Sequence, residues 1–246
     1  MQVQSTLMLI ADIAGYTRFM KFHAASLIHA QEIVGQLLET VIDAAGPRLK
    51  LAKIEGDAAF FYMPLPAGGL DANWLAARAG EIHQAFHTRA MDLKTNTLCP
   101  CDGCQQAGQL RIKIVGHAGE VVARKVGGSV ELAGVDVIVV HRLLKNDVPL
   151  PEYLLMTEPV YRMLAPEEAE RAQPLPIELD ELGRTSTWYL ELVQSDDGQA
   201  MAPKLSATRR IVRHLALIRR SLSYLIARRR PCVGFRNVVD APAGEA

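Results

Sequence analysis

Two aspartates, each within a short hydrophobic run, are the side chains of this sequence best placed to do chemistry. Asp12 lies in residues 7–17, and Asp57 lies in residues 51–61. Each run predicts a buried strand, because it is short, apolar and bounded by glycine or polar residues. A carboxylate there is costly unless a cation compensates it, and oxygen ligands favour Mg²⁺ or Mn²⁺. The pair therefore predicts a metal site, although an aspartate also commonly caps a helix or occupies a hairpin turn.

The sequence around these aspartates resembles the class III adenylate and guanylate cyclases. Residues 12–19, DIAGYTRF, resemble the family's Asp-Ile-x-Gly-Phe-Thr-x-Phe signature. Residues 53–57, KIEGD, resemble its second metal-site hairpin, and residues 110–122, LRIKIVGHAGEVV, resemble its strand-turn-strand with His-x-Gly. Because the three motifs occur in the family's order, the chain is identified as a divergent member of that family.

The resemblance implies a site for a nucleoside triphosphate, namely ATP. Asp12, Asp57 and the carbonyl of Ile13 would hold two Mg²⁺ or Mn²⁺ ions. Lys53 would contact the purine. The family's active site forms between two protomers, so the resemblance also implies a homodimer.

The segment 131–142 departs from the family pattern Asp-x-x-Gly-x-x-Val-Asn-x-Ala-x-Arg. Arg142 matches the arginine that clamps the triphosphate, and Glu131 stands where the family reads the purine edge. Ile138 replaces the asparagine that contacts the ribose and the transition state, and it cannot hydrogen-bond. Losing one such preorganised donor costs ~10²–10³ in rate. We therefore expect a protein that forms cyclic nucleotide slowly if at all, or a non-catalytic module that senses nucleotide or binds a signalling partner.

A second cluster suited to chemistry is the loop with Cys99, Cys101 and Cys104. Three cysteines in a tight Pro/Gly loop favour metal or redox chemistry over a structural disulfide in a cytosolic protein. A tetrahedral Zn²⁺ site would take its fourth ligand from elsewhere, for example Cys232. A plain surface loop with oxidisable thiols explains the pattern equally well.

The C-terminal residues 206–246 carry nine arginines and two acidic residues, whereas the rest of the chain is net acidic. The apolar side chains there recur every three or four residues and predict one seam on a helix, formed by Ile211, Leu215, Ile218, Leu222 and Leu225. The basic helix could bind an anionic membrane surface, or pack on the acidic body or a second copy. Nucleic acid is not expected, because no reader motif is present.

Composition sets the remaining limits. The chain has 246 residues with 27 basic and 27 acidic side chains, and no stretch approaches the ~20 apolar residues that span a bilayer. The N-terminus lacks the basic region of a signal peptide, so we expect a cytoplasmic protein, peripheral to the membrane if the tail binds lipid.

The elements expected from periodicity and resemblance form an α+β, ferredoxin-like cyclase fold, a mainly antiparallel sheet with helices on one face, plus a basic C-terminal helix. Strands are predicted at 6–10, 48–54, 58–63, 109–115, 120–123, 130–133, 153–156, 174–179 and 187–192. Helices are predicted at 17–45 with a break near 23–26, at 73–91, at 135–144 and at 159–163. The domain would span 1–194, with a linker at 195–205 and the tail at 206–246.

Overall fold

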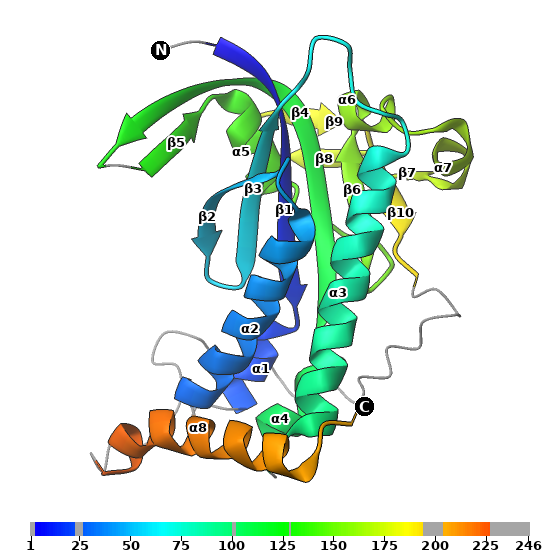
Figure 1. Ribbon diagram of the computed structural model, residues 1–246. Coiled ribbons are helices and arrows are strands. Elements are labelled where there is room, and N and C mark those ends of the chain that lie inside the picture. The colour runs from blue at the N-terminus through cyan, green and yellow to red at the C-terminus, as the bar shows by residue number, and fades with distance from the viewer. Residues whose placement is uncertain (1–2, 23–26, 100–101, 128, 194–203, 227–246) are drawn as a thin grey trace.

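The computed structural model describes residues 3–22, 27–99, 102–127, 129–193 and 204–226 (Figure 1). Its strands are β1 (Val3–Ala14), β2 (Lys50–Glu55), β3 (Ala58–Pro64), β4 (Arg111–Val126), β5 (Ser129–Ala133), β6 (Tyr153–Thr157), β7 (Gln173–Pro174), β8 (Ile177–Leu179), β9 (Gly183–Thr185) and β10 (Thr187–Glu191). Its helices are α1 (Tyr16–Phe22), α2 (Leu27–Ala45), α3 (Trp74–Asn96), α4 (Asp102–Gln106), α5 (Val135–Arg142), α6 (Glu158–Tyr161), α7 (Pro166–Arg171) and α8 (Ala207–Ile226), with a 3₁₀ turn at Ala107–Gln109.

One large sheet organises the chain. Its strand order is β2-β3-β1-β4-β6-β10-β7, with β5 paired to β4 off this path. The pairings are antiparallel except that of β4 with β6, which is parallel. The order β2-β3-β1-β4, with α2 and α3 as the connecting helices, is ferredoxin-like. The predicted α+β fold is therefore confirmed.

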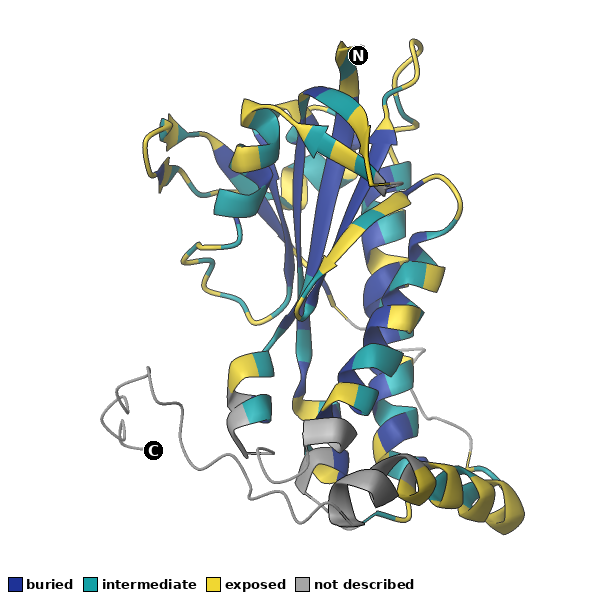
Figure 2. Cartoon of the chain, turned by 90° about the vertical axis from the view of Figure 1, so that its left-hand side faces the viewer, coloured by how far each residue is buried: buried dark blue, intermediate teal, exposed yellow. Residues whose placement is uncertain are grey.

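The two faces of the sheet are buried by different elements. Leu9 and Ile13 of β1 belong to the core beneath the long helices α2 and α3. Figure 2 shows the central strands of the sheet coloured as buried. Met8 and Ile10 alternate with them and pack on the opposite face, against α5 and the β8–β9 hairpin. This alternation in β1 fixes which side chains reach each face of the sheet.

The strand that follows α3 corrects one prediction. Two strands, 109–115 and 120–123, were expected around a His-x-Gly turn, but β4 runs without interruption. Its pairing with β1 is continuous from Ala14 opposite Arg111 to Val3 opposite Val122. The expected turn does not form there.

Two glycines in β4 explain the error, because they serve close packing and not a turn. A Cβ on Gly116 would lie 2.9 Å from Leu9 Cδ2, and one on Gly119 would lie 2.1 Å from Asp136 Cγ. Glycine within a strand often marks such a close approach. Asp136 uses this space to join α5 to β4, accepting hydrogen bonds from the backbone N–H of Glu120 at 2.7 Å and from His117 Nε2 at 2.9 Å.

Other elements agree with the sequence reading to varying degrees. The ambiguous apolar run after Gly134 is the helix α5, as expected, and the helix predicted at 17–45 is divided into α1 and α2. Helix α3 extends further than the predicted 73–91, and neither α7 nor the β8–β9 hairpin was expected.

The expected division at 195–205 stays a prediction, because 194–203 and 227–246 lie outside the described residues. Helix α8 occupies part of the expected tail. Within the described ranges, no helix is both long and apolar enough to cross a bilayer.

Candidate functional site

The end of β1 and the β2–β3 turn bring Asp12 and Asp57 together. Asp12 lies opposite Ala58 of β3 in the strand register. The backbone N–H of Ile13 donates to the carbonyl oxygen of Asp57 at 3.2 Å, which holds the turn against β1. Both carboxylates therefore stand at one end of the sheet, each supplied by the hydrophobic strand beside it.

The two carboxylates also interact through their charges. Burial, and next the negative charge of Asp12, raise the pKa of Asp57 to about 6, although a backbone hydrogen bond and Lys113 act in the opposite direction. A carboxyl pair that destabilises its own ionised form is a suitable environment for a cation, because a cation removes the repulsion. The oxygen donor set fits Mg²⁺ or Mn²⁺.

Lys113 of β4 belongs to this site and was not predicted. It lies opposite Asp12 in the register, and its Nζ is 3.0 Å from Asp12 Oδ2. The same ammonium donates to the carbonyl oxygen of Leu144 at 3.4 Å, just after α5. The alternation of Lys113 with the buried Ile112 and Ile114 is a sequence signal. It shows that Lys113 lies on the opposite face of β4 from these isoleucines, but it does not show that Asp12 is its partner.

The predicted purine-contacting lysine is held by a neighbouring acid. Lys53 Nζ lies 2.6 Å from Glu55 Oε1, and Glu55 Oε2 lies 3.1 Å from His141 Nε2. Burial raises the pKa of Glu55, but hydrogen bonding to Lys53 and the charge of His141 outweigh it, so the net shift is downward. Glu131, the other predicted base-reading residue, is exposed on β5 opposite Arg124. The carboxylate that Lys53 contacts in this chain is thus Glu55.

The predicted triphosphate clamp, Arg142, contacts the β8–β9 turn. Its Nη2 lies 3.0 Å from Glu181 Oε2, and its Nη1 donates to the carbonyl oxygen of Asp180. Both acidic side chains are highly exposed, at 89% for Asp180 and 85% for Glu181. Ion pairs of this kind are worth ~0–1 kcal/mol, so a polyphosphate could displace them.

Ile138 stands on the outer surface of α5. Its side chain is 49% exposed, although large aliphatic side chains are usually buried. The family pattern has an asparagine here, so α5 presents an apolar side chain where a hydrogen-bonding one is expected.

The cysteine loop gives no support to the predicted zinc site. Cys101 lies outside the described residues. Cys104 is buried in the apolar core at α4, and Cys99 packs against that core. The zinc site at this loop stays a prediction.

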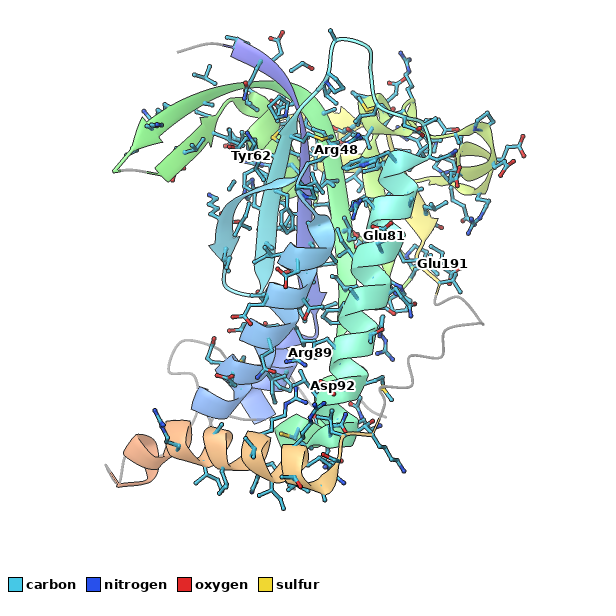
Figure 3. The ribbon with its side chains drawn as sticks, viewed as in Figure 1. Arg48, Tyr62, Glu81, Arg89, Asp92 and Glu191 are labelled. Carbon is cyan, nitrogen blue, oxygen red and sulfur yellow. The ribbon has the colours of Figure 1, made fainter. Side chains whose placement is uncertain are left out.

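Helix α8 lies across the lower ends of α2 and α3 (Figure 1). Arg213 of α8 places its Nη2 2.9 Å from Asp92 Oδ2, and Figure 3 shows Asp92 with Arg89 near the lower end of α3. The first residues of the predicted seam do not pack on the body, since Leu215 is 58% exposed and Ile211 50% exposed. The side chains of Leu222 and Leu225 lie outside the described ones. Among the described side chains, the Arg213–Asp92 ion pair joins this helix to α3.

Solved structures of cyclase domains share this fold. The guanylate cyclase domain of RhGC from Catenaria anguillulae, in complex with GTP, matches with a TM-score of 0.54 at 15% identity, covering 79% of this chain and 100% of that one. An adenylate cyclase from Trypanosoma brucei matches with a TM-score of 0.53 at 16% identity, covering 78% and 90%. The chain therefore has the fold of class III nucleotide cyclase domains.

A relative at higher identity defines the family. The uncharacterized protein Rv2561/Rv2562 of Mycobacterium tuberculosis is 43% identical over 205 residues, covering 83% of this chain and 94% of that protein. A family model described as a protein of unknown function (DUF2652) matches residues 34–153. The chain belongs to the same family as the mycobacterial protein.

Proposed function

We propose that this protein binds a nucleoside triphosphate, ATP, together with two Mg²⁺ or Mn²⁺ ions, and forms the 3′,5′-cyclic nucleotide slowly if at all. The observation that carries the proposal is the convergence of Asp12 and Asp57 at one end of the sheet. The Ile13–Asp57 backbone hydrogen bond fixes this convergence. The proposal adds the carbonyl oxygen of Ile13 as a further ligand at this site.

Each residue of the predicted site has a role in this proposal. The ions, held by Asp12, Asp57 and the Ile13 carbonyl, would neutralise the triphosphate and favour ionisation of the ribose 3′-hydroxyl. Lys53 and Glu131 would recognise the purine, and Arg142 would bind the triphosphate. In the cyclase arrangement these residues act across a dimer, so a second copy would complete each site.

A second candidate function is a non-catalytic module that binds nucleotide to control a signalling partner. Ile138 favours it, because no hydrogen bond to the ribose or the transition state can come from this side chain. Both functions retain metal-dependent nucleotide binding, and they differ only in turnover.

Calorimetry with ATP and with GTP, each with and without Mn²⁺, tests the shared requirement. We expect the metal to strengthen binding, and Asp12→Asn combined with Asp57→Asn to weaken metal-dependent binding at least about tenfold, or ~1.4 kcal/mol. Asp147→Asn, at an exposed loop position, is the matched control and should bind as wild type does. Equal affinity with and without metal in the wild-type protein would refute the proposed site. An assay for cyclic product in the same samples separates the two functions.

A further inference from the structure

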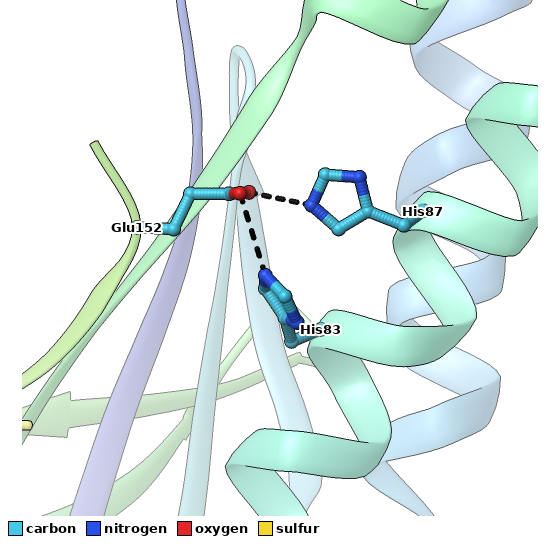
Figure 4. Close-up of side chains that lie close together, drawn as sticks. All are labelled: His83, His87 and Glu152. Atoms are coloured by element: carbon cyan, nitrogen blue, oxygen red, sulfur yellow. Dashed lines mark hydrogen bonds and ion pairs between the residues drawn. The ribbon is translucent and has the colours of Figure 1, made fainter. Parts of the chain in front are cut away.

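Two histidines and a glutamate converge between α3 and the sheet, away from the aspartate site. His83 and His87 are four residues apart on α3, so they share one face of the helix. Glu152 precedes β6 and approaches them from the sheet (Figure 4). One ligand atom from each residue can be chosen so that all three lie within 4.8 Å of one another.

The two histidines are buried although they are polar, and the Glu152 side chain is 13% exposed. His83 is 2% exposed and His87 is 5% exposed. His87 Nε2 lies 2.6 Å from Glu152 Oε1, within a hydrogen bond, and His83 Nε2 lies 3.4 Å from Glu152 Oε2. The His83 contact is longer than an ordinary N–H···O hydrogen bond, so His83 pairs with the carboxylate without good hydrogen-bond geometry. This contact is poorly formed for a buried polar group.

The surroundings hold the carboxylate in place. The backbone N–H of Ile112 donates to Glu152 Oε1 at 3.0 Å, and the backbone N–H of Leu192 donates to the carbonyl oxygen of Glu152 at 3.3 Å. At metal sites, hydrogen bonds from groups that do not themselves bind the ion orient the ligands in this way. Arg111 Nε lies 3.8 Å from Glu152 Oε2, and its side chain is 41% exposed. Its Nη1 donates to the carbonyl oxygens of Gly108 and Leu110, at 3.1 Å each, so the guanidinium is held mainly by backbone groups outside the cluster.

We propose that His83, His87 and Glu152 bind a divalent transition-metal ion of the Zn²⁺ type. Two imidazole nitrogens and one carboxylate form a donor set used for Zn²⁺, with a fourth position left for water. Mg²⁺ prefers oxygen ligands, so this site selects a different ion from the aspartate pair. The ion would join α3 to the edge of β4 and β6. Gln84 follows His83 where zinc hydrolases carry the glutamate of their H-E-x-x-H motif, so the general base of that motif is missing at this position.

Two of the observed separations can be compared with those around such an ion, and each is made to a different oxygen of Glu152. With metal–ligand distances of about 2.0–2.1 Å, ligand atoms at a tetrahedral ion stand roughly 3.3 Å apart. The 3.4 Å between His83 Nε2 and Glu152 Oε2 is close to this value. The hydrogen-bonded pair of His87 and Glu152 must open by roughly 0.7 Å, which small side-chain rotations provide.

The test uses the full chain, dialysed against a chelator and titrated with Zn²⁺ alone. We expect one tightly bound ion, and X-ray absorption should show only nitrogen and oxygen ligands, at about 2.0–2.1 Å, without sulfur at about 2.3 Å. This measurement needs no variant and distinguishes the site from the cysteine loop. A protein that binds no stoichiometric Zn²⁺, or binds it through sulfur alone, overturns the proposal.

Variants then assign the ligands. His83→Gln, His87→Gln and Glu152→Gln should each weaken Zn²⁺ binding at least about tenfold, as loss of a direct ligand does. His214→Gln on α8 is the matched histidine control, and Asp12→Asn with Asp57→Asn removes the proposed nucleotide site; both should keep Zn²⁺ affinity. Circular dichroism identifies variants that fail to fold. If the ligand variants do not fold, the X-ray absorption spectrum of the wild-type protein with Zn²⁺ tests the proposal by itself. Full Zn²⁺ affinity in folded His83→Gln and His87→Gln would refute the assignment.

Discussion

Lys113 Nζ lies 3.0 Å from Asp12 Oδ2, so an ammonium group contacts one of the two proposed metal ligands. Both side chains are largely buried, at 22% exposure for Lys113 and 16% for Asp12. Removing one partner of a buried ion pair leaves an uncompensated charge, which is strongly destabilising. An entering divalent cation must therefore compete with Lys113 for the Asp12 carboxylate.

This relationship predicts that Lys113→Met strengthens binding of Mn²⁺ alone by about tenfold, or ~1.4 kcal/mol. The ammonium no longer competes for Asp12, and methionine keeps a similar length and apolar stem. Calorimetry in the absence of nucleotide measures the effect. Lys125→Met, at an exposed position of β4, is the control and should leave Mn²⁺ affinity unchanged. Weaker Mn²⁺ binding in Lys113→Met would mean that Lys113 supports the site and does not compete in it.

Turnover should depend on the side chain at position 138. Ile138→Asn restores a hydrogen-bonding group on the exposed face of α5, and one preorganised donor is worth ~10²–10³ in rate. We therefore expect more cyclic product from Ile138→Asn than from wild type in a timed assay with ATP and Mn²⁺. Val135→Asn places the same side chain elsewhere on α5, where wild-type Val135 is 60% exposed, and should change nothing. A wild-type rate of ~10 s⁻¹, typical of enzymes, would contradict the argument.

Gly119→Ala should destabilise the fold, because its Cβ would lie 2.1 Å from Asp136 Cγ. Asp136 must then move and lose its bonds to β4, so we expect a loss of ~1–3 kcal/mol in the free energy of unfolding. Urea denaturation gives the value. Gly35→Ala in α2 is the matched control, since nothing lies within 4 Å of its added Cβ, and it should stabilise by roughly 0.5–1 kcal/mol. Equal stability for Gly119→Ala and wild type would show that α5 adjusts without cost.

The fold could be predicted where local pattern and chain order agree. Residues 51–61 carry their own strand and turn signals, and the hairpin formed there. β4 was misread because Gly116 and Gly119 look like turn residues, whereas their role depends on Leu9 and Asp136, distant in sequence. A glycine that creates space for a remote side chain has no local signature.

The candidate site, like the fold, could be predicted only where the signal is local. Asp12 and Asp57 were found because each lies within its own hydrophobic run. Lys113 was missed because its partner depends on the β1–β4 register. Arg142 was foreseen as a phosphate clamp, but its engagement by the β8–β9 turn follows from a hairpin that no sequence signal indicated.

The histidine pair was visible in sequence as two histidines four residues apart, which places both on one helical face. Its partner Glu152 could not be predicted. That glutamate reaches α3 only because β6 pairs with β4 in parallel. Residue spacing brings the two histidines together, whereas long-range strand pairing adds the glutamate.

The attachment of α8 should depend on one carboxylate, Asp92. Its Oδ2 accepts from Arg213 Nη2 at 2.9 Å and contacts Arg89 Nη1 at 2.6 Å, while its Oδ1 accepts from Asn96 Nδ2 at 2.7 Å. Arg213→Gln removes only the partner on α8. A hydrogen bond to a charged group contributes ~1.5–3 kcal/mol when well formed, so this variant should release α8. Faster hydrogen exchange of the α8 amides at neutral pH measures the release, and Asp43→Asn, exposed at the end of α2, is the control.

Acid should release α8 in the same way. Burial raises the pKa of Asp92, but hydrogen bonds from Arg213 and Asn96 and the charges of both arginines outweigh it, so the net shift is downward. A carboxyl whose folded-state pKa is depressed adds stability that is complete above its ordinary value of about 3.9 and is lost as pH falls through the lowered pKa. We therefore expect exchange protection of α8 to be constant from about pH 5 to 7 and to fall in stronger acid. Arg213→Gln should abolish this contribution to the pH dependence, because the ion pair to α8 is then gone at every pH. Loss of protection in wild type already near pH 6, where Asp92 is fully ionised, would show that a histidine or another group holds the helix.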